Sequence, residues 1–208
     1  MTQVEPHAAW RGAFGDAYMD RNLRTPEAVR RRERFFARAL SSITVDAGTR
    51  VLEVGANLGI NLSALGHLSS ASLFGVDLNE VALARARREP DLCLRVALAA
   101  AAAEALPFRD ASVDLVFTSG VLIHVPPDRL RQACAEMLRV SRRWVFCAEY
   151  FSARPEEIEY RGRPGLLFKR DFGGFFLDHW PELRVLDYGF VWKRVDFGDL
   201  TWWLFEKP

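Results

Sequence analysis

The chain has 208 residues and a formal net charge of +1, and half of its residues are hydrophobic. This length predicts one domain, and the composition excludes a disordered chain and provides no field that would attract nucleic acid. No segment predicts a membrane helix or a signal peptide, and three scattered cysteines predict neither a disulfide framework nor a zinc site. We expect a cytoplasmic protein without a metal, either a monomer or a homodimer.

An amphipathic helical segment is predicted over residues 1–48. Trp10, Phe14 and Tyr18 recur at helical spacing, and Pro26 is placed to begin a second helix because its fixed φ suits a first turn. The arginines of this second helix, Arg30, Arg31, Arg32 and Arg34, predict a solvent-exposed face, with a binding patch as the alternative.

Strands and helices then alternate within a domain predicted to span residues 49–208. Strands are expected at residues 50–54, 73–76, 92–96, 113–118, 144–148, 184–188 and 201–205, and helices at 57–68, 80–88, 97–105, 129–140 and 171–177. The alternation predicts an α/β fold with a mostly parallel sheet and helices on both of its faces. The last two strands are close in sequence, which predicts antiparallel pairing at one edge.

The best chemical signal is residues 51–60, where an apolar strand leads through a glycine turn into a helix. Ligands of such sheets bind outside the carboxyl ends of the strands. Gly55 allows the backbone to approach a ligand, and Gly59 allows the helix to pack close to the strand. Asn57 replaces a middle glycine, so the pattern is neither a pyrophosphate-binding turn nor a P-loop.

Two acids accompany this turn. Asp77 ends the second predicted strand, where it can accept both hydroxyls of a ribose, and Glu53 can bind the amino group of a zwitterion or order the turn. Together, Glu53, Gly55, Gly59 and Asp77 resemble the S-adenosylmethionine site of class I methyltransferases. S-adenosylmethionine is therefore the expected cofactor; the alternatives are an NAD-binding domain with an altered turn and a fold that has lost its ligand.

Further cofactor contacts are expected beside these residues. Leu78 adjoins Asp77, and Ala103 and Glu104 precede a Leu-Pro-Phe turn in the region that holds the adenine amine in many methyltransferases. Ala102 stands where an Asp is common. Adenine recognition is therefore assigned to backbone groups near Ala103 or to Glu104, which also fits a solvated helix residue.

Catalytic candidates follow the fourth and fifth predicted strands. Ser119, at the first of these strand ends, is an expected cofactor contact because this end lies beside the methyl donor in the class I fold. His124 has an intrinsic pKa of about 6.5, which suits removal of a proton from an acceptor hydroxyl, or it caps the loop. Tyr150 is a second candidate for acceptor contact, with packing as the alternative.

Over nearly its full length the chain resembles the pseudaminic acid biosynthesis-associated methylase family. The matching segments are residues 10–18, 21–22, 55–62, 120–124, 160–162, 168–172 and 187–194. The resemblance implies a small Rossmann-like class I methyltransferase with a seven-stranded, mostly parallel sheet and one antiparallel edge strand. This chain departs from the family at Ser119, where many relatives carry a basic residue.

The resemblance also implies that residues 1–48 form a lid over the cofactor, with Tyr18 or Arg21 near the methionine carboxylate. Arg161 and Arg170 are expected to bind the acceptor, with surface charge as the alternative. The expected reaction is methyl transfer to a small molecule, either a sugar or nonulosonic acid or a secondary metabolite. The alternatives are cyclisation or cleavage of S-adenosylmethionine with release of methylthioadenosine, and an RNA or protein methyltransferase or binding module.

Overall fold

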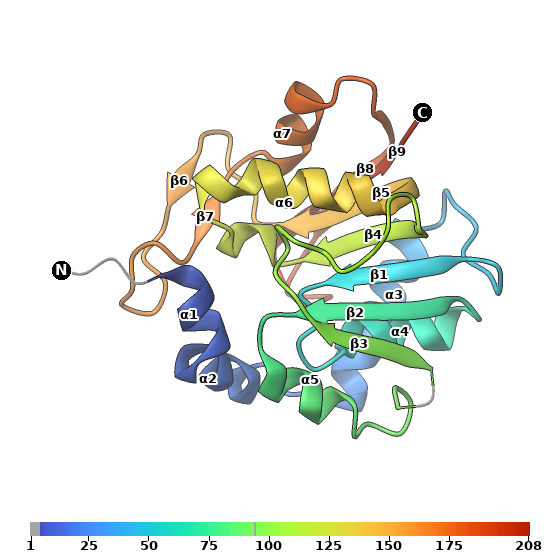
Figure 1. Cartoon of the computed structure of the whole chain (residues 1–208), viewed down its shortest axis with the longest axis horizontal. Coiled ribbons are helices and arrows are strands. Elements are labelled where there is room, and N and C mark those ends of the chain that lie inside the picture. The colour runs from blue at the N-terminus through green and yellow to red at the C-terminus, as the bar shows by residue number, and fades with distance from the viewer. Residues whose placement is uncertain (1–4, 94) are drawn as a thin grey trace.

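A seven-stranded sheet in the order β3-β2-β1-β4-β5-β9-β8 forms the centre of the computed structural model, which describes residues 5–93 and 95–208 (Figure 1). The strands are β1 (Arg50–Val54), β2 (Ser72–Asp77), β3 (Val96–Ala100), β4 (Val113–Ser119), β5 (Ser141–Glu149), β8 (Arg184–Val191) and β9 (Leu200–Glu206). β1 to β5 are parallel, and β9 pairs antiparallel with β5 and with the outermost strand β8. The predicted fold class is confirmed, as is the antiparallel pairing of the last two strands. A separate two-stranded sheet pairs β6 (Glu156–Glu157) with β7 (Phe168–Lys169).

Helices cover both faces of the large sheet (Figure 1). They are α1 (Pro6–Arg11), α2 (Ala13–Arg21), α3 (Pro26–Ala39), α4 (Ile60–Leu68), α5 (Glu80–Ala86), η1 (Leu122–His124), α6 (Pro127–Val140) and α7 (Phe172–His179). α6 and α7 share one buried cluster with the sheet, whereas α3 and α4 share the other. No helix within residues 5–93 and 95–208 is long and apolar enough to cross a membrane.

α3 fastens the N-terminal segment to the sheet. It begins where predicted, at Pro26, and the Thr25 hydroxyl accepts the Ala28 N–H at 3.1 Å as an N-cap. Phe36 is buried, with its ring centroid 5.4 Å from that of Phe117 on β4. Burying such a side chain stabilises the fold by about 1.5–3 kcal/mol, so α3 holds the chain that precedes the domain against the sheet.

The predicted helix at 97–105 is wrong, because this alanine-rich segment instead contributes β3. β3 pairs in parallel with β2, from Val96 opposite Leu73 to Ala100 opposite Asp77. The helical preference of alanine is a weak prior that strand pairing readily overrides. The strand predicted at 92–96 accordingly overlaps β3 only at Val96, and Leu94 within it lies outside the described residues.

The carboxyl ends of the parallel strands meet at one edge of the sheet. α1 and α2 lie across this edge on one side, and β6 and β7 lie on the other (Figure 1). Since polar groups that follow parallel strands gather at such an edge, this arrangement sets the position of the site.

Candidate functional site

A pocket at this edge collects most of the residues singled out from the sequence. Its lining includes Tyr18, Glu53, Gly55, Asn57, Asp77, Leu78, Ala103, Glu104, Ser119 and His124. It also includes residues that the sequence did not single out for the site, among them His7, Arg32, Asn61 and Val121. Arg21, Gly59, Tyr150, Arg161 and Arg170 lie outside the lining.

The glycine turn after β1 requires left-handed backbone. Gly55 has a φ of +82°, Asn57 of +47° and Gly59 of +70°. A Cβ atom on Gly55 would lie 2.3 Å from Cγ2 of Val121, so glycine here allows the turn to pack against the start of η1. The helix predicted from residue 57 begins only at Ile60, because Asn57 and Gly59 cannot adopt helical dihedrals there.

Asp77 ties this turn to the end of β2. Its Oδ2 accepts the Asn57 N–H and its Oδ1 accepts the Asn79 N–H, both at 2.8 Å. Burial raises the pKa of the Asp77 carboxyl. Each oxygen has a further lone pair, so the carboxylate can still accept two ligand hydroxyls in the pocket.

Glu53 is an acid inside an otherwise apolar central strand, and it is 1% exposed. Burial raises its pKa to about 8. Asn61 Nδ2 donates to Glu53 Oε1 at 2.6 Å, while Glu53 Oε2 and Asn61 Oδ1 have no hydrogen-bond partner within the part of the chain that the structure describes. Buried polar atoms without partners are costly, so these two oxygens are suited to a ligand that donates hydrogen bonds, such as an ammonium group.

Arg32 of α3 supplies the opposite charge. The arginines of this helix were predicted to be solvent-exposed, yet Arg32 lines the pocket. Its guanidinium lies 4.2 Å from the ring centroid of Phe197, and burial lowers its pKa. Its buried Nε has no partner among the described residues. Cationic Arg32 and the acceptor oxygens of Glu53 and Asn61 together match an α-amino acid, which carries both a carboxylate and an ammonium.

His124 presents one ring nitrogen to the pocket side. Its Nδ1 lies 2.6 Å from the carbonyl oxygen of Leu166, which can only accept, so Nδ1 carries the hydrogen and the lone pair of the neutral ring lies on Nε2. Burial lowers the pKa of His124 to about 4. The ring is therefore neutral near pH 7, with Nε2 able to accept a proton.

Four aromatic rings close the space between α1, α2 and the β6–β7 sheet. Ring centroids are separated by 4.4 Å for Trp10 and His124, 5.4 Å for His124 and Tyr160, 5.9 Å for Tyr160 and Phe14, and 5.2 Å for Phe14 and Trp10. The buried indole Nε1 of Trp10 has no partner in the described part of the chain. The N-terminal helices thus wall the pocket beside His124.

Polar contacts hold α1 over the pocket. His7 Nε2 lies 3.0 Å from Glu104 Oε1, and Arg129 on α6 pairs with Glu5 at 2.9 Å. Asn79, which follows β2, donates to the Trp10 carbonyl at 3.2 Å. Glu104 is only 8% exposed, so it is not the solvated helix residue that the sequence left open.

The predicted residues outside the lining make other contacts. Arg21 lies 5.9 Å from the ring centroids of both Phe14 and Tyr18, and Arg161 lies 5.8 Å from that of Tyr160, beside the aromatic wall. Lys169 Nζ lies 5.6 Å from the Tyr150 ring, and Arg170 lies 5.0 Å from that of Phe175 on α7. No group of three or more His, Cys, Asp or Glu that could hold a metal occurs in the described ranges.

Comparisons with known proteins give similarities in sequence and in fold. Residues 51–143 match the model of the methyltransferase domain family. The chain is 28% identical over 180 residues to 24-methylenesterol C-methyltransferase 2 of Oryza sativa subsp. japonica, a match that covers 75% of this chain and 49% of that protein. The chain thus spans about half the length of this relative.

Two solved structures share the fold. Magnesium protoporphyrin IX methyltransferase from Synechocystis PCC 6803, solved with S-adenosylmethionine, has a TM-score of 0.74 at 11% identity, with 100% of both chains covered. The 1,6-didemethyltoxoflavin-N1-methyltransferase of Burkholderia thailandensis, solved with its substrate and S-adenosylhomocysteine, has a TM-score of 0.74 at 20% identity, covering 100% of this chain and 92% of that one.

The chain has the Rossmann-like α/β fold that is shared with solved S-adenosylmethionine-dependent methyltransferases. Residues 51–143 match the methyltransferase domain family, and neighbours with the same fold have been solved with S-adenosylmethionine or S-adenosylhomocysteine bound. The pocket combines buried acceptor atoms that have no partner among the described residues, a cation on Arg32 and the carboxylate of Asp77.

Proposed function

We propose that the protein transfers a methyl group from S-adenosylmethionine to a hydroxyl or amino group of a small molecule. One observation supports this most directly. Among the described residues, the buried atoms Glu53 Oε2 and Asn61 Oδ1 have no hydrogen-bond partners beside Arg32, as a site for an amino acid zwitterion requires, and both lie in the segment that matches the methyltransferase domain family.

In this proposal Glu53 and Asn61 accept hydrogen bonds from the ammonium of the cofactor, and Arg32 binds its carboxylate. Arg32 takes the role that was predicted for Tyr18 or Arg21, because Arg21 lies outside the pocket lining and Tyr18, which lines it, carries no positive charge. Asp77 accepts the ribose hydroxyls. Leu78, Ala103 and Glu104 contact the adenine, and Ser119 borders the methionine end.

The cofactor supplies an electrophilic methyl group on a sulfonium, so the protein has mainly to align the acceptor and remove its proton. We assign proton removal to His124 Nε2, since Nδ1 is held by the Leu166 carbonyl. Trp10 Nε1 is free to donate to the acceptor. Tyr150, which lies outside the lining, is assigned to packing.

Of the predicted lid 1–48, only α1 and α2 act as a lid in this proposal, because they contribute His7, Trp10 and Tyr18 to the pocket walls, whereas α3 packs on the face of the sheet and residues 1–4 lie outside the described residues. The lid excludes water from the acceptor space, which favours transfer to the acceptor. Arg161, beside the aromatic wall, is proposed to contact the acceptor at the rim. Arg170 packs over Phe175 and is given no such role.

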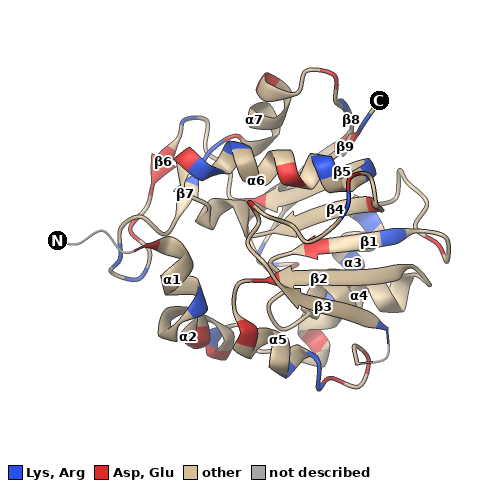
Figure 2. Cartoon of the chain, in the orientation of Figure 1, with Lys and Arg blue, Asp and Glu red and all other residues tan. Residues whose placement is uncertain are grey.

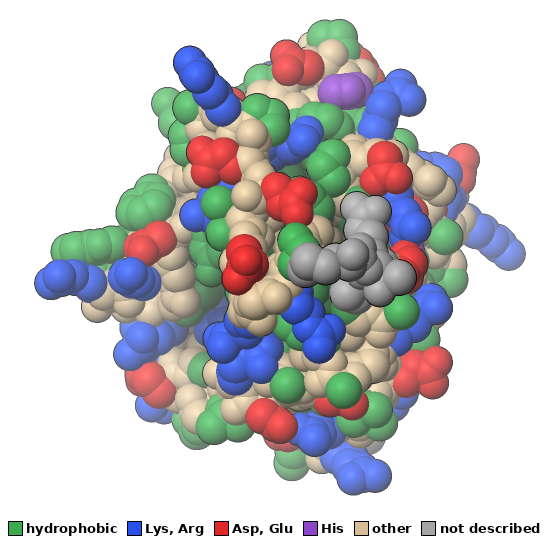
Figure 3. All heavy atoms as spheres, turned by 90° about the vertical axis from the view of Figure 1, so that its left-hand side faces the viewer, with side chains coloured by type: hydrophobic (Ala, Val, Ile, Leu, Met, Phe, Trp, Pro, Cys, Tyr) green, Lys and Arg blue, Asp and Glu red, His purple; other side chains and the backbone are tan. Residues whose placement is uncertain are grey.

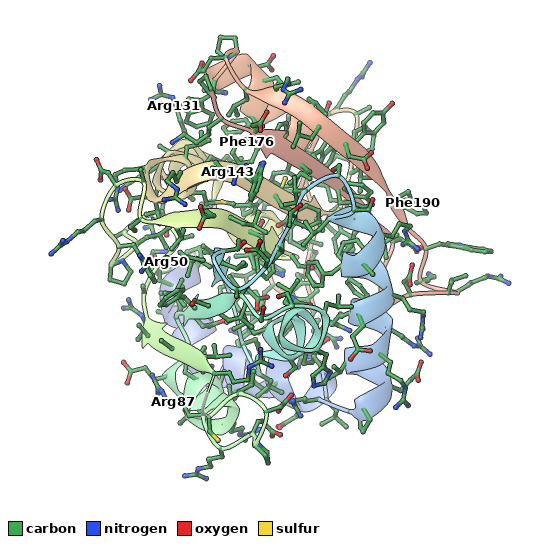
Figure 4. All side chains as sticks on the ribbon, turned by 90° about the vertical axis from the view of Figure 1, so that its right-hand side faces the viewer. Arg50, Arg87, Arg131, Arg143, Phe176 and Phe190 are labelled. Carbon is green, nitrogen blue, oxygen red and sulfur yellow. The ribbon has the colours of Figure 1, made fainter. Side chains whose placement is uncertain are left out.

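A sugar or nonulosonic acid, or a secondary metabolite, is the proposed acceptor. The resemblance to pseudaminic acid biosynthesis-associated methylases supports this, and the similar proteins named above are methyltransferases that act on small molecules. Basic and acidic side chains are interspersed over the elements and over the lid face (Figures 2 and 3), which does not favour a polyanionic partner. Arg50 and Arg143, at the amino ends of β1 and β5, lie on the side of the molecule opposite the lid (Figure 4).

Incubation with methyl-labelled S-adenosylmethionine and a panel of nucleotide sugars, nonulosonic acids and secondary metabolites tests the proposal. Label in an acceptor with release of S-adenosylhomocysteine is the expected result. Release of methylthioadenosine would establish the cleavage or cyclisation alternative, and label in RNA or protein would establish the macromolecular one. Failure to bind S-adenosylhomocysteine by calorimetry would contradict the proposal as a whole.

A further inference from the structure

Glu149 is a completely buried carboxylate at the last position of β5, for which the proposed reaction has no direct use. Its Oε1 accepts the N–H groups of Val121 and Leu122, each at 3.2 Å, and its Oε2 accepts that of Ile123 at 3.3 Å. No cation lies within ion-pair distance of Glu149 among the described residues. Three successive backbone donors thus replace a counterion.

These three donors are the ones that a short 3-10 helix leaves unsatisfied. η1 spans only Leu122–His124, and its N-cap residue Val121 makes no side-chain cap. A helical turn of this length is not stable alone, because its first N–H groups have no partners within the turn. Glu149 provides all three partners from the neighbouring strand, so it fixes the position of η1 on the end of the sheet.

Both ends of this segment face the site. Val121, at its start, packs on the glycine turn after β1, since a Cβ atom on Gly55 would lie 2.3 Å from Cγ2 of Val121. His124, at its end, has its ring fixed by the Leu166 carbonyl at 2.6 Å. The hydrogen bond to Leu166 fixes the orientation of the His124 ring. The position of the His124 backbone relative to the glycine turn after β1 depends on η1.

We propose that Glu149 is a positioning residue that acts through the backbone of η1 to place His124 for proton removal from the acceptor. This inference rests on the proposed function. The sequence suggested Tyr150 as the functional residue after the fifth strand, whereas this inference assigns a functional role to its neighbour Glu149. Neither residue lines the pocket, but Glu149 accepts the backbone N–H groups of the η1 segment, whereas the Tyr150 ring lies 5.6 Å from Lys169 Nζ.

Glu149→Gln keeps the size of the side chain but turns an acceptor into an amide whose N–H₂ opposes a backbone N–H. We expect kcat to fall about 10- to 100-fold, the effect of a small misplacement of a catalytic group. S-adenosylhomocysteine affinity should stay close to that of the unaltered protein, because Glu53, Arg32 and Asp77 are unchanged. An E149Q protein with unaltered kcat would overturn the proposal.

A double-mutant cycle separates positioning from a general structural role. If Glu149 acts through His124, E149Q lowers kcat of the unaltered protein but has no further effect on H124Q. Equal losses in both backgrounds would overturn the inference. Asp114→Asn is the matched control: Asp114 is a buried carboxylate that accepts the Arg50 N–H at 2.9 Å outside the pocket lining, so D114N should leave kcat intact.

A pH profile gives a second readout. Burial raises the pKa of Glu149 to about 7, and the other titratable groups that influence or adjoin it are Cys134, Cys147 and Tyr150, whose pKa values burial also raises. At saturating cofactor, kcat should therefore rise with pH to a midpoint near 7 as Glu149 ionises. In E149Q this rise of kcat with pH should be absent. A rise that persists in E149Q would contradict the proposal.

The NMR signals of backbone amides provide a test that needs neither an identified acceptor nor a folded variant. In the unaltered protein, the N–H signals of Val121, Leu122 and Ile123 should shift together with a midpoint near pH 7. They should not titrate in E149Q if that variant folds. Absence of the shift in the unaltered protein would overturn the inference, whereas a shift without any methylated product would count against the proposed function alone.

Discussion

Replacing Glu53 with Gln tests the cofactor site with almost no change in shape. Glu53 is 1% exposed, and its Oε2 has no partner in the described part of the chain. In the proposed complex this oxygen receives a hydrogen bond from the cofactor ammonium. A bond to a charged group contributes about 1.5–3 kcal/mol, so E53Q should weaken S-adenosylhomocysteine binding about 10- to 150-fold at pH 8.

The same residue predicts how binding depends on pH. Burial raises the pKa of Glu53 from 4.5 to about 8, while Arg32 lowers it and Asp77 raises it to a smaller extent. A ligand ammonium favours the ionised form, so affinity for S-adenosylhomocysteine should rise by up to about tenfold per pH unit from pH 6 and level off near 8. This slope should be absent in E53Q.

The unfolding free energy of the ligand-free protein depends on pH with the opposite sign from ligand affinity. A folded-state pKa above the unfolded value means that the stabilising contribution is fully present below pH 4.5 and is lost as the pH rises through about 8. With these two values, Glu53 should cost about 3 kcal/mol of unfolding free energy between pH 6 and pH 9. The difference between the unaltered protein and E53Q in urea titrations isolates this contribution from other groups.

Calorimetry at pH 6, 7, 8 and 9, in two buffers of different ionisation enthalpy, measures affinity and proton release together. The exposed Glu182 offers the control, and Glu182→Gln should match the unaltered protein throughout. E53Q binding of S-adenosylhomocysteine with unaltered affinity at pH 8 would refute the assigned contact. A flat affinity between pH 6 and pH 8 would refute the proton linkage.

Three further predictions concern the turn, the ribose contact and the lid. Gly55→Ala should lower the unfolding free energy by about 2–4 kcal/mol, because its φ of +82° and its contact with Val121 both oppose a Cβ. Gly162→Ala, with a φ of +74° and open space around it, should cost only about 1–2 kcal/mol, and equal losses in the two variants would contradict the contact. Asp77→Asn should weaken S-adenosylhomocysteine binding at least about tenfold by calorimetry, and an unchanged affinity would exclude Asp77 as a ligand. Trp10→Ala should reduce kcat/KM for the acceptor more than cofactor affinity, since its ring lies against His124, and an effect confined to cofactor affinity would contradict this.

Much of the fold was predictable from local pattern. The alternation of strands and helices, the strand that ends at Val54, and Pro26 as the start of α3 depend on hydrophobic periodicity and on one fixed dihedral angle. The 97–105 prediction failed because alanine fits both helix and strand, and pairing with β2 decided between them.

The residues of the site likewise divide into those that the sequence predicted and those that it did not. Glu53 and Asp77 were found from the sequence because they lie in the last two positions of two adjacent parallel strands, and such strands place their carboxyl ends at a common edge. Arg32, His7 and Glu149 were given no site role, since Arg32 and His7 enter the pocket from helices far away in the chain and Glu149 acts through its contacts with η1.

The sequence by itself therefore determined the sheet, the glycine turn and the acids at its strand ends, all of which follow from short-range spacing. Only the tertiary structure decided which arginine enters the pocket, that α1 covers it, and that Glu149 holds η1. The physical reason is that these contacts depend on the relative placement of separate elements. Burial then turns ordinary carboxyl groups into ones whose pKa values lie near 7 and 8.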